Sequence, residues 1–163
     1  MKKKVVVGVG LIVAAVAWYA FRPELLFVNK SVSETFPASS VAANSTEQLA
    51  SGQFKGYAHE TQGNADVFKV NGKRVLRLTN FKTSNGPDVH VYLVAAPDAK
   101  DDATVKNAGF IDLGSMKGNM GDQNYDVPES ADLAKYQAVT IWCARFNVNF
   151  GTAPLTASKL ASN

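Results

Sequence analysis

Apolar and polar side chains alternate with a period of two along most of the chain after about residue 50. The alternation is clearest over residues 89–94 and over residues 65–78, where Asn71-Gly72 separates two alternating runs. A period of two is typical of half-buried strands, and Asn-Gly supplies the positive φ angles that a tight hairpin turn requires. Further short runs, rich in β-branched and aromatic residues, lie between clusters of turn residues at positions 51–59, 110–113, 123–127 and 139–155. This pattern predicts an all-β domain, either a β-sandwich or a closed antiparallel barrel.

The last of these runs carries the single cysteine of the chain, Cys143. Its even positions form an apolar row, so an unbroken strand would place Cys143 on the odd face, two residues from Arg145. A nearby cation and partial exposure lower the pKa of a thiol and make it reactive. The same sequence allows a turn at residues 144–147, which would break this parity. It also allows a buried and inert cysteine, because free cysteines are among the most buried residues.

A pattern without polar interruptions occupies the N-terminus. Lysines at positions 2–4 precede an uncharged apolar run from Val5 to Phe21 that closes with an aromatic pair. As a helix this run would cover about 25 Å, near the lower limit for crossing a bilayer. Because lysines favour the cytoplasmic side, we expect residues 1–22 to form a single-pass transmembrane helix with the C-terminal domain outside the cytoplasm. The alternative is export after signal cleavage, since Ala15-Val16-Ala17 matches the small-residue cleavage pattern.

Length and charge then limit the domain count and the kinds of partner. The chain has 163 residues, and the part after the apolar run is long enough for one domain with a proper core. We expect a linker over residues 23–50, the β domain over residues 51–156 and a tail over residues 157–163. The formal net charge is +3, and the lysines at positions 2–4 account for all of it. A neutral domain lacks the basic patch that nucleic acid requires, so no nucleic-acid partner is expected.

Metal binding and hydrolysis have weaker support in the sequence. His59, His90, Cys143 and a methionine are the residue types of a blue-copper site, but the usual grouping of these ligands in one loop is absent. Residues 97–107 are predicted to form a charged loop, and its aspartates between residues 98 and 102 lack the ordered spacing of a calcium loop. No Gly-x-Ser-x-Gly motif is present. The sequence therefore predicts neither a metal site nor a hydrolase.

Four spaced motifs resemble a single family. They are Gly56-Tyr-Ala-His59-Glu-Thr61-Gln-Gly63, the block from Val75 to Leu93 that contains Asn85-Gly86-Pro87-Asp88-Val89-His90, the block from Asp112 to Pro128, and Ile141-Trp142-Cys143-x-x-Phe146 with its continuation to Leu155. Over about residues 51–155 the chain is similar to the DM-thirteen domain family, often called the electron-transfer DM domain. The resemblance implies a β-sandwich that is exported or membrane-tethered, as in bacterial members. It also implies a redox role for the cysteine that corresponds to Cys143.

Together these observations predict an extracytoplasmic, membrane-tethered redox or electron-transfer module. Cys143 is the predicted redox thiol, with Arg145 as its catalytic neighbour. The predicted binding residues around them are His59, His90, Asn85 and Asp88. The expected partners are the membrane and a protein redox partner, and neither the residues nor the resemblance identifies a cofactor. The alternative is a non-catalytic ligand- or protein-binding module of the cell envelope, with loops 85–88 and 118–125 as its surface.

Overall fold

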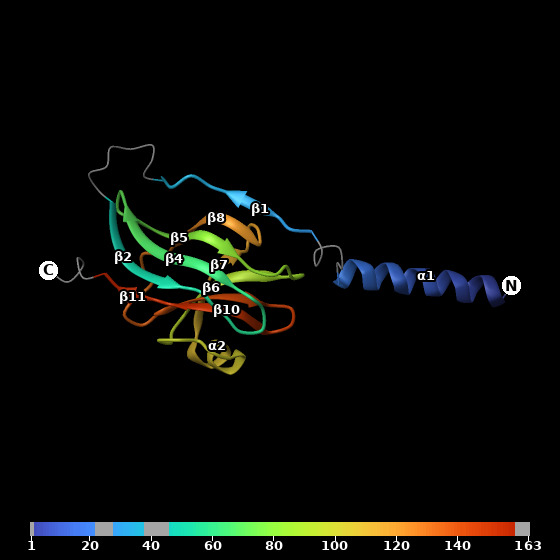
Figure 1. Ribbon diagram of the computed structural model, residues 1–163. Coiled ribbons are helices and arrows are strands. Elements are labelled where there is room, and N and C mark those ends of the chain that lie inside the picture. Colours follow the sequence, from blue (N-terminus) through green and yellow to red (C-terminus); the bar gives the residue numbers. More distant parts are fainter. Residues whose placement is uncertain (1, 22–27, 38–45, 159–163) are drawn as a thin grey trace.

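Two β-sheets pack face to face in the computed structural model, which describes residues 2–21, 28–37 and 46–158 (Figure 1). Sheet A has the strand order β1-β8-β5-β4-β2-β11, and sheet B has the order β3-β10-β9-β6-β7. The strands are β1 (Ser31–Ser33), β2 (Thr46–Gln53), β3 (Lys55–Gly56), β4 (Gln62–Val70), β5 (Lys73–Lys82), β6 (Val89–Val94), β7 (Phe110–Ser115), β8 (Met120–Val127), β9 (Ala138–Cys143), β10 (Val148–Pro154) and β11 (Thr156–Ala157); the helices are α1 (Lys2–Phe21) and α2 (Asp102–Ala108). The prediction of a β-sandwich is confirmed.

Antiparallel hairpins build most of both sheets. β4 and β5 are joined at Asn71-Gly72, whose φ angles of 51° and 83° confirm the predicted tight turn. Among the described strands, β1 and β8 form a parallel pair, the two strands coming from distant parts of the chain. Three of the four strands at the sheet ends are very short, since β1 has three residues and β3 and β11 have two each, whereas β7 has six.

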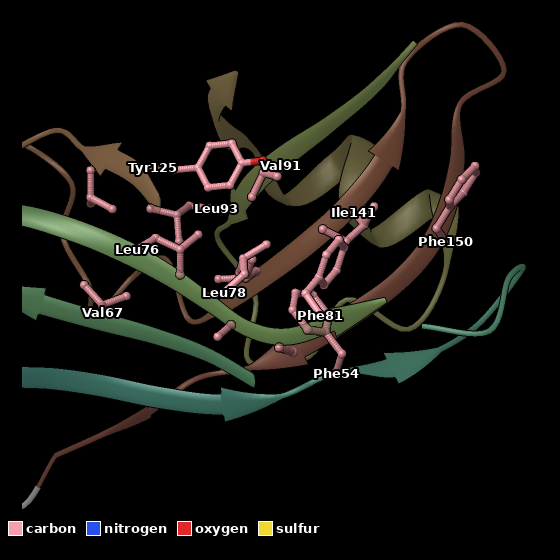
Figure 2. Packing of buried hydrophobic residues seen from close by; sticks show 14 of the residues in the cluster. Phe54, Val67, Leu76, Leu78, Phe81, Val91, Leu93, Tyr125, Ile141 and Phe150 are labelled. Carbon is pink, nitrogen blue, oxygen red and sulfur yellow. The ribbon is translucent and has the colours of Figure 1, made fainter. Parts of the chain in front are cut away.

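The main core fills the space between the sheets (Figure 2). On β6, Val89, Val91 and Leu93 point into this core, as their alternation predicts. Its other large members come from both sheets and include Phe54, Val67, Leu76, Leu78, Phe81, Tyr125, Ile141 and Phe150. Burial of this apolar layer is the main stabilising contribution that a sandwich of this kind can make.

Helix α2 covers the outer face of sheet B, where a second apolar cluster lies. Val105 of α2 packs there with Tyr92 and Trp142. The sequence predicted a charged loop over residues 97–107, whereas the structure forms this helix. The reason is local, because the Asp101 carboxylate accepts a hydrogen bond from Thr104 N at 2.7 Å and caps the first turn. These bonds from Thr104 also lower the pKa of the Asp101 carboxyl.

A buried polar network fixes the chain before α2 to sheet B. The Asn149 amide and the Thr152 hydroxyl both donate to the Ala99 carbonyl, at 2.7 and 2.9 Å. The Thr152 hydroxyl lies 2.9 Å from that of Thr140 on the neighbouring strand. All three polar side chains are almost completely buried, so satisfying them here avoids the cost of unpaired polar groups.

The N-terminal helix does not support the predicted membrane span. Among the described residues, no helix combines the length and the apolar character that crossing a membrane requires.

Parts of the predicted linker and tail form strands. β1 and the first residues of β2 lie within residues 23–50, and β11 extends to residue 157. Residues 22–27, 38–45 and 159–163, which include part of the predicted linker and most of the predicted tail, lie outside the described residues.

Candidate functional site

Cys143 is the last residue of β9, the central strand of sheet B. Its side chain belongs to the core cluster between the sheets, and the residue is only 1% exposed. Val89 of β6 and Val148 of β10 lie opposite it in the two flanking strands. The thiol therefore ends the apolar layer that runs along β9 through Val139 and Ile141.

The sequence left open whether the strand continues past Cys143 or turns at residues 144–147, and the structure has the turn. Residues 144–147 form a turn in which Asn147 adopts a φ of 55°. The turn resets the alternation, so that Val148 on β10 comes back opposite Cys143. Arg145 is exposed in the turn and does not share a strand face with the thiol.

A pocket of about 190 Å³ lies beside the buried thiol. Its walls are formed by Cys143 together with His59, Asn85, Gly86, Pro87, Phe146, Val148 and Phe150. Since one liquid water occupies about 30 Å³, the pocket has room for roughly six waters or for one small molecule. Cys143 is thus buried, yet one side of it borders space rather than packed side chains.

His59 contributes the imidazole in the wall of this pocket. Its ring lies against Phe150, with the ring centroids 4.0 Å apart. Its backbone N–H donates to the Phe150 carbonyl at 3.3 Å, which ties this loop to β10. Within the part of the chain that the structure describes, the ring itself has no hydrogen-bond partner. Burial lowers the pKa of His59, so the imidazole is neutral at pH 7 and can accept a proton.

The loop from Asn85 to Asp88 contributes Asn85, Gly86 and Pro87 to the wall of the pocket. The Asp88 carbonyl accepts a hydrogen bond from Ala144 N at 2.8 Å, which joins the loop to the end of β9. Gly86 leaves no room for a side chain, because a Cβ there would lie 2.7 Å from the Val89 side chain and 3.1 Å from the Phe150 ring. The loop therefore packs as a close wall over β10.

His90 lies apart from the thiol, on the face of β6 that points away from the core. Its Nε2 is 3.1 Å from the Asp88 carboxylate, and its Nδ1 is 3.0 Å from the Asp112 carboxylate. Beside it, the rings of Tyr92 and Phe110 stack with centroids 4.2 Å apart. Burial and the charges of Asp112 and Asp88 raise the pKa of Tyr92.

The structure thus divides the predicted binding residues into two groups. His59 and Asn85 meet Cys143 at one pocket, while His90 and the Asp88 carboxylate form a separate cluster. Within the described ranges, no group of three or more His, Cys, Asp or Glu side chains could hold a metal ion. A copper site would need both histidines near the thiol, but only His59 borders the pocket with Cys143, and His90 lies between the Asp88 and Asp112 carboxylates.

Three pocket residues were not predicted from the sequence. Phe146, Val148 and Phe150 line the pocket, although the alternation had placed them on the face opposite Cys143. The signal that could have revealed them is Asn147, since asparagine tolerates the positive φ of a tight turn better than most residues.

A family model described as electron transfer DM13 matches residues 53–155. No curated protein and no solved structure matches the chain. The matched region contains both the pocket and the His90 cluster.

Proposed function

The chain belongs to the electron transfer DM13 family, and from that premise we propose that it is an extracytoplasmic redox module whose reacting group is the Cys143 thiol. The observation that carries this proposal is the pocket that borders the thiol and the His59 imidazole together. A cysteine with only a packing role would not need an open space beside it. The small volume selects small oxidants over a protein disulfide.

The proposed reaction is a two-electron oxidation by a hydroperoxide. The sulfur of Cys143 attacks one peroxide oxygen, the S–O bond forms and the O–O bond breaks. The departing oxygen takes up the thiol proton, so that a thiol and a peroxide give a sulfenic acid and an alcohol, or water if the oxidant is hydrogen peroxide. Two external thiols then restore Cys143. The first forms a mixed disulfide and releases water, and the second displaces Cys143 as a thiol.

His59 has a specific part in this proposal. A neutral imidazole at the pocket can take the thiol proton and return it to the departing oxygen. Arg145, predicted as the activating cation, lies in the exposed turn and fits a contact with the external redox partner better than activation of the thiol.

We expect folded protein to react at Cys143 with a small uncharged alkylating agent and with hydrogen peroxide. The measurement is intact-protein mass spectrometry over time, with the urea-unfolded protein as the reference for full reactivity. A matched pair of variants tests the imidazole, because His59→Gln should slow peroxide oxidation whereas His90→Gln should leave it nearly unchanged. If Cys143 stays unmodified until the protein unfolds, the redox proposal fails.

The location outside the cytoplasm and the contact with a membrane are also proposals. The membrane contact is supported by α1, whose large apolar side chains from Val5 to Tyr19 are each more than half exposed. Apolar surface of this extent is unfavourable in water and is typical of contact with lipid or another apolar surface. The location is supported by the lysines at positions 2–4, because lysines next to an apolar run favour the cytoplasmic side.

In cell fractionation, the full chain should sediment with membranes and be released by detergent but not by high salt. The double variant Leu11→Lys/Ile12→Lys should shift it to the supernatant, because two charges on the helix oppose transfer into lipid. Protease added outside spheroplasts should degrade the β domain. Degradation only after lysis would contradict the proposed location.

A second candidate function is a non-catalytic ligand-binding module. It is favoured by a second cavity of about 500 Å³, whose walls come largely from residues 85–89 and 115–119. These segments overlap the loops that the sequence suggested as a binding surface. The two functions differ in whether activity depends on the sulfur of Cys143.

A further inference from the structure

Residues 28–37, here called the strap, lie outside the matched family region and cover one edge of sheet A (Figure 1). Within the strap, β1 pairs in parallel with the first residues of β8. Backbone bonds continue the pairing at both ends, because Met120 N donates to the Lys30 carbonyl and Glu34 N donates to the Asp122 carbonyl. The strap is therefore an integral strand of the sheet.

Two glycines shape the sheet edge to receive the strap. A Cβ at Gly118 would collide with the Lys30 carbonyl and would lie 2.7 Å from the Val32 side chain. Gly121 has a φ of 92°, and a Cβ there would collide with the Val32 carbonyl. Only glycine allows the strap to approach this closely at both positions.

Glu34 is the ionic contact that fixes the strap. Its carboxylate accepts hydrogen bonds from Lys117 Nζ at 2.8 and 3.0 Å and from Asn124 N at 2.7 Å. Burial on its own raises the pKa of this carboxyl, but the bonds from Lys117 and Asn124 outweigh that effect, and the pKa is lowered. The carboxylate form of Glu34 therefore stabilises the docked strap.

Other charged groups surround this contact. Arg77 of β5 donates to the Glu34 carbonyl at 2.9 Å and forms an ion pair with Asp122 at 2.7 Å. Lys117 Nζ also lies 5.1 Å from the centroid of the Tyr125 ring. Burial, together with the charge of Glu34, raises the pKa of Tyr125 to about 12, so this phenol stays neutral near pH 7. Asp126 lines a surface groove together with Glu34, Lys117 and Tyr125.

The other end of the strap reaches the wall of the Cys143 pocket. The Asn85 amide donates to the Val28 carbonyl at 2.6 Å. Asn119, which is almost completely buried, binds the next two strap residues, with 2.7 Å to Lys30 N and 2.9 Å to the Asn29 side chain. Asn85 is itself one of the residues that border the thiol. One continuous set of hydrogen bonds thus joins β8, the strap and the pocket wall.

We propose that the strap is part of the Cys143 site, where it holds the loop from Asn85 to Asp88 in place and limits which molecules reach the thiol. The inference rests on the proposed function only in taking Cys143 as the reacting group. Glu34 and Gly118 act through the strap and are positioning residues. The strap, which lies outside the family domain, therefore sets a size limit on the oxidant.

The test compares the rates at which the folded full chain reacts with two aromatic disulfides. One is the small, uncharged 4,4′-dithiodipyridine, which reacts in acid as well as at neutral pH, and the other is the larger, anionic 5,5′-dithiobis(2-nitrobenzoate). In Glu34→Gln and in Gly118→Ala, the rate with the larger reagent should rise about tenfold, since each change weakens strap contacts of hydrogen-bond strength. The rate with the small reagent should change much less. Glu47→Gln on β2 and Gly10→Ala on α1 are controls that should match the unmodified chain.

The pH profile separates positioning by Glu34 from a general structural effect. Because folding lowers its pKa, Glu34 stabilises the docked strap above its ordinary value of 4.5, and this contribution is lost as the pH falls through the lower folded value. The ratio of rates between Glu34→Gln and the unmodified chain should therefore be large at pH 7 and approach one in acid. The ratio for Gly118→Ala should not follow this titration.

Three results would overturn the inference. In the first, Cys143 reacts, but the ratio of its rates with the two reagents is the same in the variants as in the unmodified chain. The proposed function then still stands. In the second, the faster reaction depends on urea as steeply as global unfolding does, which assigns it to unfolding rather than to the strap. In the third, Cys143 does not react in the folded protein at all, and the proposed function fails as well.

Discussion

Replacing Phe81 with alanine should lower the free energy of unfolding by about 3–5 kcal/mol, more than any other single substitution considered for this protein. Phe81 is 2% exposed and packs between the sheets, with its ring centroid 5.4 Å from that of Phe54 (Figure 2). Truncation would remove most of a large buried side chain and leave a cavity that β5 cannot close. A loss of this size is a large fraction of the stability of a domain with this length.

The measurement is urea denaturation followed by tryptophan fluorescence. Phe146→Ala is the matched control, because Phe146 is 52% exposed and the same truncation should cost well under about 1 kcal/mol there. Equal losses for the two variants would mean that the space between the sheets is not the dominant core.

Replacing Cys143 should abolish every peroxide-dependent mass change assigned to a thiol, since the chain has no other cysteine. The choice of substitute decides whether the protein also loses stability. Cys143 is 1% exposed among apolar side chains, so serine would bury a hydroxyl without an evident partner, whereas alanine only leaves a small void. We expect Cys143→Ser to be less stable than Cys143→Ala by about 1–3 kcal/mol.

These two variants also decide between the candidate functions. A redox module should lose its activity in cells with either substitute, while a ligand-binding module should keep it in Cys143→Ala. Urea denaturation of both proteins must accompany the assay, so that a loss through unfolding is not mistaken for a loss of chemistry. Equal stability of the two variants would indicate that the serine hydroxyl finds a partner at the end of β9.

The sequence predicted those parts of the fold that depend on neighbours along the chain. The alternation in residues 89–94 identified the core face of β6, and Asn71-Gly72 identified the β4–β5 turn, because both signals act over a few residues. The pairing of β1 with β8 joins segments about ninety residues apart, and no local pattern specifies it. Residues 23–50 mix a short apolar run with polar residues and lack a strong period, so a linker was the natural prediction for them.

The candidate site was predicted in part for the same reason. Cys143 and His59 were selected by residue type, and the fold brings both to one pocket. Arg145 and His90 were selected in the same way, but the turn at residues 144–147 removes one from the thiol face and the parity of β6 places the other on the far face of the sheet. Residue type indicates what chemistry is available, while turns and parity decide which groups meet.

The unequal lengths of the strands at the sheet ends have a consequence for self-association. An end strand with few residues offers few unpaired backbone groups, so it is a poor template for a strand from another copy. Among the described end strands, β1, β3 and β11 are protected in this way, whereas β7 presents six residues, the exposed Phe110 among them. Fibril growth or edge-to-edge aggregation of this domain would therefore begin at β7, and a lysine introduced on that strand should suppress it.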